Sequence, residues 1–191
     1  MLKDLIKKSR SYRSFDHSVK ISDAQLRDWI ECARFCPSSI NLQMLKFRPV
    51  TDPSECQAVL AQTRWAGKLQ DIKLPPKGYE PTAYIVICAD TNVIGSAEKF
   101  QKDVGICAQS IMLAACEAGF GGCMIGAFMP SGVAQALQLP EYLLPQLVLA
   151  LGKPNETVQL TELPETGDPS YYRQNGVHYS PKRSLDELII K

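Results

Sequence analysis

The chain has 191 residues, of which 45% are hydrophobic and 21% charged, so we expect one globular domain, residues 1–191, with a sizeable core. Its formal net charge of +1 argues against a general nucleic-acid-binding protein, which would carry a strongly basic face. Seven cysteines without a Cys-x-x-Cys pair and only two histidines argue against a structural zinc site and suit reduced thiols in a cytoplasm.

The N-terminal stretch combines a short helix with a basic, hydroxyl-rich segment. Residues Leu2 to Lys8 form an amphipathic helical pattern that lacks the apolar core of a signal peptide. It continues into Ser9 to Phe15, where basic side chains alternate with hydroxyls and aromatics. Composition alone leaves two interpretations of this segment, a solvated basic loop or an anion site suited to phosphate oxygens.

A capping box at Ser22 to Gln25 predicts a helix that ends near Pro37. Its buried face is expected to contain Leu26, Trp29, Ile30 and Ala33. A polar loop, residues 37–43, then enters a predicted strand at residues 46–51. The serines and the asparagine of this loop are typical turn formers, whereas Gln43, beside a strand, is not explained that way.

The next segment carries a helix, an excursion and a buried strand. Pro53 at the first helical position predicts a helix to about Gln62. Residues 66–81 are rich in Lys, Pro and Gly and are expected to be an exposed excursion and a candidate lid. Trp65 at its base is interpreted as core packing, with the wall of a pocket as the alternative. The continuous apolar run at residues 84–89 predicts a buried strand.

The stretch from Asp103 to Phe128 is the most apolar part of the chain. Its first part predicts a helix without a polar face, which is buried in a core or in a subunit interface but is too short and interrupted for a membrane span. Gly119 is placed to end this helix, and residues 123–128 follow as a short apolar segment. We expect this exit to present exposed backbone to a ligand.

The C-terminal third is expected to hold a short helix at residues 130–137, a buried strand at 147–152 and a final helix at 185–188. Residues 164–180, with their Asn-Gly and Asp-Pro pairs, are expected to be loop. Helices and strands that alternate in this way predict an α/β or α+β sandwich with one central sheet.

Few residues are candidates for acid, base or nucleophile. The glycines of residues 119–122 follow a helix instead of opening one, so they do not form a dinucleotide-binding fingerprint. His17 and His178 lie in polar stretches and are interpreted as surface residues, and the cysteines as small core residues. A cofactor is therefore expected to carry the chemistry.

Five segments, taken together, resemble the motifs of the FMN-dependent nitroreductase family. Residues 9–15 resemble its Arg-Ser-x-Arg-x-Phe opening, residues 37–43 its second motif and residues 119–126 its third. Residues 151–154 and 181–185 are similar to its last two motifs, and all five occur in the order of the family. Met44 and Leu45 stand where the family commonly has Pro-Trp, a departure expected to alter the floor of the pocket. The segment around residues 65–84 resembles a short branch of the family.

The resemblance implies an α+β fold with a central mixed, mainly antiparallel sheet flanked by helices, in an intertwined homodimer that binds FMN at its interface. Phosphate contacts are implied for Arg10, Ser11, Lys182 and Arg183. Arg13 is implied at the N1–O2 edge of the flavin, where its charge would raise the reduction potential. Backbone near N5 is implied for Ile125, Gly126 and Ala127. Contacts from the partner subunit are implied for Pro37, Ser38, Ser39, Asn41 and Gln43.

The resemblance also implies an activity, the use of NAD(P)H to reduce nitroaromatic, quinone or related acceptors in a ping-pong cycle through flavin N5. No metal, nucleic acid or membrane is expected to take part. An FMN-binding sensor without NAD(P)H turnover is the alternative. A module whose basic loop binds an acidic partner is a third hypothesis.

Overall fold

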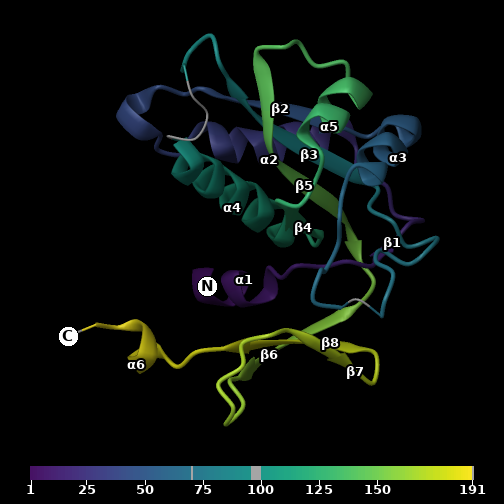
Figure 1. The fold of residues 1–191 in the computed structure, drawn as a ribbon, viewed down its shortest axis with the longest axis vertical. Coiled ribbons are helices and arrows are strands. Elements are labelled where there is room, and N and C mark those ends of the chain that lie inside the picture. The colour runs from purple at the N-terminus through teal and green to yellow at the C-terminus, as the bar shows by residue number, and fades with distance from the viewer. Residues whose placement is uncertain (70, 96–99, 191) are drawn as a thin grey trace.

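The centre of the fold is an antiparallel sheet. In the computed structural model, which describes residues 1–69, 71–95 and 100–190, its main path runs in the order β1 (Phe15–Asp16), β5 (Leu143–Pro154), β3 (Ala83–Asp90) and β2 (Leu45–Val50). Strand β4 (Gly121–Ile125) also pairs with β5, and each of these pairings is antiparallel. The expected mainly antiparallel α+β architecture is therefore confirmed (Figure 1).

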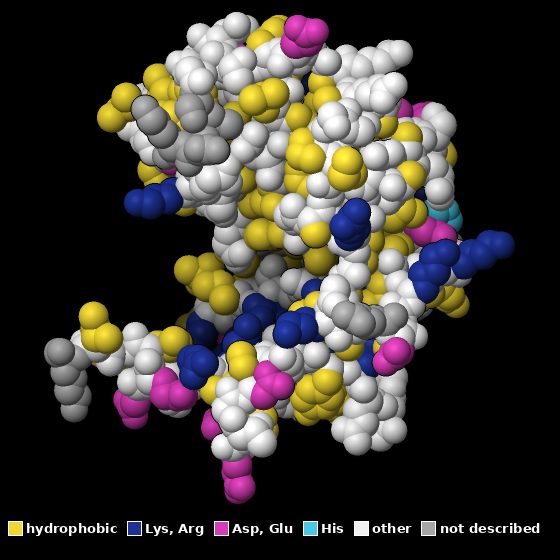
Figure 2. All heavy atoms as spheres, in the orientation of Figure 1, with side chains coloured by type: hydrophobic (Ala, Val, Ile, Leu, Met, Phe, Trp, Pro, Cys, Tyr) yellow, Lys and Arg dark blue, Asp and Glu magenta, His cyan; other side chains and the backbone are white. Residues whose placement is uncertain are grey.

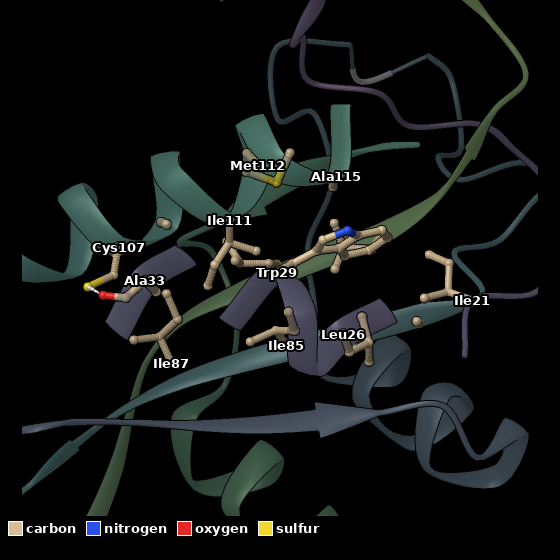
Figure 3. Close-up of a cluster of buried hydrophobic side chains, with 14 of the residues drawn as sticks. Ile21, Leu26, Trp29, Ala33, Ile85, Ile87, Cys107, Ile111, Met112 and Ala115 are labelled. Atoms are coloured by element: carbon tan, nitrogen blue, oxygen red, sulfur yellow. Dashed lines mark hydrogen bonds between the residues drawn. The ribbon is translucent and has the colours of Figure 1, made fainter. Parts of the chain in front are cut away.

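Helices cover both faces of this sheet. On one face α2 (Asp23–Arg34) and α4 (Gln101–Glu117) pack on alternate strand residues such as Ile85 and Ile87 (Figure 3). On the other face α3 (Pro53–Ala61) and α5 (Pro130–Ala136) pack on Tyr84 and Val86. Every residue of β3 is buried, as its continuous apolar run predicts, because the strand is covered from both sides.

The helix boundaries follow local signals in the sequence. The side chains of Ser22 and Gln25 complete the predicted capping box of α2. At the start of α3, Asp52 accepts hydrogen bonds from the next turn and Pro53 occupies the first helical position. Gly119 ends α4 with a φ of 80°, a conformation that glycine adopts without a steric penalty.

Helix α4 carries the apolar face that its sequence predicts, but not all of it is buried. Val104, Ile111 and Ala115 face the core, whereas Ile106 is 40% exposed on the opposite side. The short helix α1 (Leu2–Lys8) has no buried residue at all. None of the helices in the described ranges has both the length and the apolar character to span a bilayer.

The expectation of a loop over residues 164–180 is wrong for residues 172–174 and 177–180, which form strands. With β6 (Thr157–Glu162), which precedes this region, they make a second, three-stranded sheet in the order β6, β8 (Val177–Lys182) and β7 (Tyr172–Gln174). Asn175 and Gly176, with φ values of 51° and 78°, form the tight turn between β7 and β8. Figure 1 shows this sheet apart from the main one, with α1 between them and α6 (Leu185–Leu188) projecting at the C-terminal end.

Three glycines allow the N-terminal segment, β4 and β5 to pack closely together. Ser11 forms a parallel bridge with Gly122, and Tyr12 N donates to Gly122 O at 2.9 Å. A Cβ on Gly122 would lie 2.1 Å from the Ala150 carbonyl oxygen. Cβ atoms on Gly121 and Gly152 would instead collide with the rings of Tyr12 and Phe15 in the N-terminal segment. The backbones of β4 and β5 therefore approach at Gly122 more closely than a side chain there permits, and the two rings pack directly on the other glycines.

We predict that Gly122→Ala destabilises the fold by ~2 kcal/mol or more, because the added methyl meets rigid backbone. Urea unfolding at fixed protein concentration measures the loss. The control is Gly67→Ala, where nothing lies within 4 Å of the added atom, and its free energy of unfolding should stay within about 0.5 kcal/mol of the parent. Equal stability of the two variants would contradict the close-approach argument.

Candidate functional site

Two of the predicted site segments meet at β4. The segment from Arg10 to Arg13 is held against Gly122 by the Ser11 bridge. Strand β4 ends at the buried Ile125, and Gly126 and Ala127 follow it as exposed backbone. The structure thus brings together the N-terminal and the glycine-rich candidates, which are separated by more than a hundred residues in the chain.

Arg10 has the surroundings of an anion ligand. Its Nη2 donates to the Ile6 carbonyl at 2.5 Å, while its Nε is buried and has no partner among the described residues. A buried donor without an acceptor is costly, which favours an acceptor supplied by a ligand. Figure 2 shows Lys and Arg side chains gathered in the hollow between the main body and the C-terminal segment.

Lys182 and Arg183, the C-terminal candidates, lie where β8 ends and α6 begins. Both side chains are exposed, and Arg183 Nη1 lies 3.3 Å from Glu187 Oε1. An exposed ion pair of this kind contributes little to stability, so the Arg183 guanidinium can exchange its carboxylate partner for another anion at small cost.

Arg13 is held in a buried polar cluster that the sequence did not predict. Its Nη1 donates to Ser11 O at 3.1 Å and lies 3.3 Å from Nε2 of His178, and its guanidinium stacks 5.0 Å from the centre of the Tyr171 ring. Its backbone N–H donates to the carboxylate of Glu156, which also pairs with Arg173. Arg13 itself is only 9% exposed.

His178 is buried at 3% exposure, so the interpretation of this residue as a surface histidine is wrong. It lies on β8, in a stretch where the sequence pattern predicts a loop. Burial first, and then the charges of Arg13 and Arg173, lower the pKa of His178 to about 4. The ring is therefore neutral near pH 7, and because a guanidinium only donates, Nε2 must accept from Arg13.

The loop of residues 37–43 is strained and firmly anchored. Ile40, Asn41 and Gln43 all have positive φ values, of 49°, 56° and 50°. Ser39 holds the loop to α4, because its N and Oγ both donate to the buried Asp103 carboxylate at 2.9 Å. Ile40 is β-branched and 89% exposed, a combination of strain and exposure that is typical of a binding surface.

The protomer does not gather all the candidates into one cavity. A cavity of about 760 Å³ between α2, β2 and α4 is lined by Ser38, Gln43 and Met44, but not by Arg10, Arg13 or Gly126. Gly126 borders a different cavity, of about 680 Å³, beside α5 and the start of β5. The candidate residues thus form separate groups on the protomer.

The expectation that the cysteines are core residues holds for the five buried thiols, but it is wrong for Cys32, which is exposed, and Cys36 is only partly buried. Burial raises the pKa of Cys56 to about 11 and that of Cys88 and Cys107 to about 12, so these side chains are protonated and poorly nucleophilic at neutral pH. Among the residues that the structure describes, no group of His, Cys, Asp and Glu side chains is arranged to hold a metal ion.

The sequence of this chain matches the model of a known family. The model of the family described as "Nitroreductase family" matches residues 6–153, most of the chain. The chain belongs to the nitroreductase family. The matched region contains the close contact between the N-terminal segment and β4, the strained loop and helix α4.

Several relatives of this nitroreductase-family chain have names that describe a chemistry. A CR(VI) reductase from a Pseudomonas strain is 27% identical over 81% of this chain and 67% of its own length. The putative NAD(P)H nitroreductase YdgI of Bacillus subtilis is 25% identical over 78% of this chain and 87% of its own. A nitroreductase family protein from Streptococcus pneumoniae has the same fold over the whole of both chains, with a TM-score of 0.69 at 20% identity.

We predict that His178→Gln flattens the pH dependence of stability between pH 4 and 6.5. The unfolded chain binds a proton at His178 below about pH 6.5, while the folded chain does not do so until about pH 4, so native stability is full above this window and falls as the pH drops through it. The full loss is about 3 kcal/mol. Urea unfolding across this range measures it. The exposed His17→Gln is the control and should retain the native slope.

Proposed function

We propose that this protein is an FMN-dependent oxidoreductase that uses NAD(P)H to reduce nitroaromatic, quinone or related acceptors in a ping-pong cycle. The observation that carries the proposal is the buried Nε of Arg10, which has no partner among the described residues and lies in the segment that bridges to Gly122 at the start of β4. Such a donor suits a phosphate-bearing ligand. Membership of the nitroreductase family supports it. So do the name of YdgI and that of a Clostridium difficile protein called an FMN-dependent nitroreductase, which shares 24% identity and a TM-score of 0.62.

We assign different residues of the protomer to different parts of FMN. We assign the phosphate to Arg10, Ser11, Lys182 and Arg183, because a dianion requires several charge-assisted donors. Arg13 is assigned to the N1–O2 edge of the flavin, and the backbone of Ile125, Gly126 and Ala127 to the N5 side. Bound FMN would accept a hydride and return the electrons to the acceptor, so no protein base is required.

A homodimer completes this assignment. Large apolar side chains remain exposed on elements from both ends of the chain and from its middle, and a second copy is the partner that would cover them. They are Leu2, Ile6, Ile40, Ile106, Leu185, Leu188 and Ile190. In the dimer we assign the strained loop of one protomer to the flavin of the other, through Pro37, Ser38, Ser39, Asn41 and Gln43.

We also propose the cytoplasm as the compartment, because all seven cysteines of the chain are free thiols.

Arg10→Ala and Arg183→Ala should each weaken FMN binding far more than riboflavin binding. Each variant removes a charge-assisted hydrogen bond to the phosphate, which costs on the order of tenfold or more in affinity. Fluorescence titration of the apoprotein with both flavins gives the ratio. Lys77→Ala, on an exposed loop, removes one charge elsewhere and should leave that ratio unchanged. Equal losses for the two flavins would place these residues away from the phosphate.

Turnover provides the test of the function itself. NAD(P)H should reduce the bound FMN, and a nitroaromatic or quinone should reoxidise it in a separate step. Initial rates with both substrates varied should then give parallel double-reciprocal lines. Intersecting lines would indicate a ternary complex instead. Reduction by dithionite but by neither nicotinamide would favour a flavin-binding sensor or a different electron donor.

A further inference from the structure

The C-terminal sheet supplies the side-chain groups that contact the Arg13 guanidinium from outside its own segment. His178, on β8, offers Nε2 at 3.3 Å, and Tyr171, next to β7, offers the face of its ring at 5.0 Å. The centres of the two rings lie 5.3 Å apart with a tilt of 34°, so the rings also contact each other and the three side chains form one cluster. Arg13 and His178 are separated by 165 residues in the sequence.

The partners of Arg13 are notable because they are neutral. Arg13 takes part in no ion pair within the described residues, although it is 9% exposed. The nearby Glu156 carboxylate binds the Arg13 backbone N–H and the Arg173 guanidinium instead. A buried arginine with a purely structural role would normally be paired with a carboxylate. The Arg13 guanidinium itself has no carboxylate partner among the described residues.

The same contacts leave part of the guanidinium unused. Its hydrogen bonds in the described part of the chain run through Nη1 alone, so Nη2 and Nε remain without a protein acceptor there. A neutral histidine and a tyrosine face fix the plane of the guanidinium without neutralising it. Two donors of a guanidinium held in a fixed plane therefore have no acceptor in the described part of the chain and can serve an anionic ligand.

We propose that His178 and Tyr171 are positioning residues, which hold Arg13 so that its charge faces the flavin and raises the reduction potential. The inference rests on the proposed FMN function, because it needs a bound flavin as the acceptor. In this proposal the C-terminal sheet influences the reduction potential of the flavin. It does so through Arg13 and not by direct contact with the cofactor.

A double-mutant cycle tests this role. The variants are His178→Leu, which removes the acceptor, Arg13→Met and the combination of the two, each loaded with FMN. The readout is the two-electron midpoint potential of the bound flavin. His178→Leu should lower the potential when Arg13 is present and leave it unchanged in the Arg13→Met background, because a residue that acts through another has no effect without it.

A second readout uses the apoprotein. The affinity for riboflavin, which lacks the phosphate, should fall about tenfold in His178→Leu, the scale of one charge-assisted hydrogen bond. His178→Gln provides a side-chain oxygen that accepts from Arg13, so both readouts should stay near the native values. The matched control is His17→Leu, the same change at the exposed histidine, and it should alter neither readout.

The outcomes separate the inference from the function on which it rests. An equal shift of the potential in both backgrounds, or no shift in either, overturns the positioning role. If His178→Leu does not fold, Tyr171→Leu enters the same cycle with the same expected result. A protein that binds neither FMN nor riboflavin overturns the proposed function as well, whereas flavin binding with an unaltered potential overturns only this inference.

Discussion

The close approach of the N-terminal segment to β4 and β5 is the constraint on which the rest of the structure depends. It requires the absence of side chains at Gly121 and Gly152, since a Cβ at either would lie closer than 3 Å to the ring of Tyr12 or Phe15. Because no side chain intervenes, the rings of Tyr12 and Phe15 pack directly on the sheet backbone. Gly122 in turn allows β4 to approach the Ala150 carbonyl of β5. The glycines of the family motifs thus have a packing role here, which places the residues between the two aromatics at the edge of the candidate cofactor site.

A second constraint connects the two sheets. The turn after β5 carries Glu156, whose carboxylate binds the backbone of Arg13 and the side chain of Arg173. One residue earlier, Asn155 N donates to Ser14 O at 2.9 Å. These contacts fix the C-terminal sheet to the N-terminal segment by hydrogen bonds and charge. Arg13 from the N-terminal segment and Arg173 from the C-terminal sheet consequently share the Glu156 carboxylate.

Much of the fold could be predicted from local signals. The capping box at Ser22, the proline at the start of α3, the buried run of β3 and the glycine after α4 each act within a few residues, and each is found as predicted. The C-terminal sheet was missed because its strands are short and partly exposed, so their apolar alternation is weak. The Asn175–Gly176 turn was the available signal, and it was interpreted as a loop marker instead of a hairpin.

The sequence by itself determined the helices, the buried strands β3 and β5 and the family to which the chain belongs, because these depend on patterns between neighbouring residues. Only the tertiary structure decided that His178 is buried against Arg13, that Asp103 anchors Ser39, and that Ile40 is strained and exposed. These contacts join residues far apart in the chain or reflect backbone angles imposed by packing. Periodicity and spacing carry no information on either, so the environment of each site residue had to be found in three dimensions.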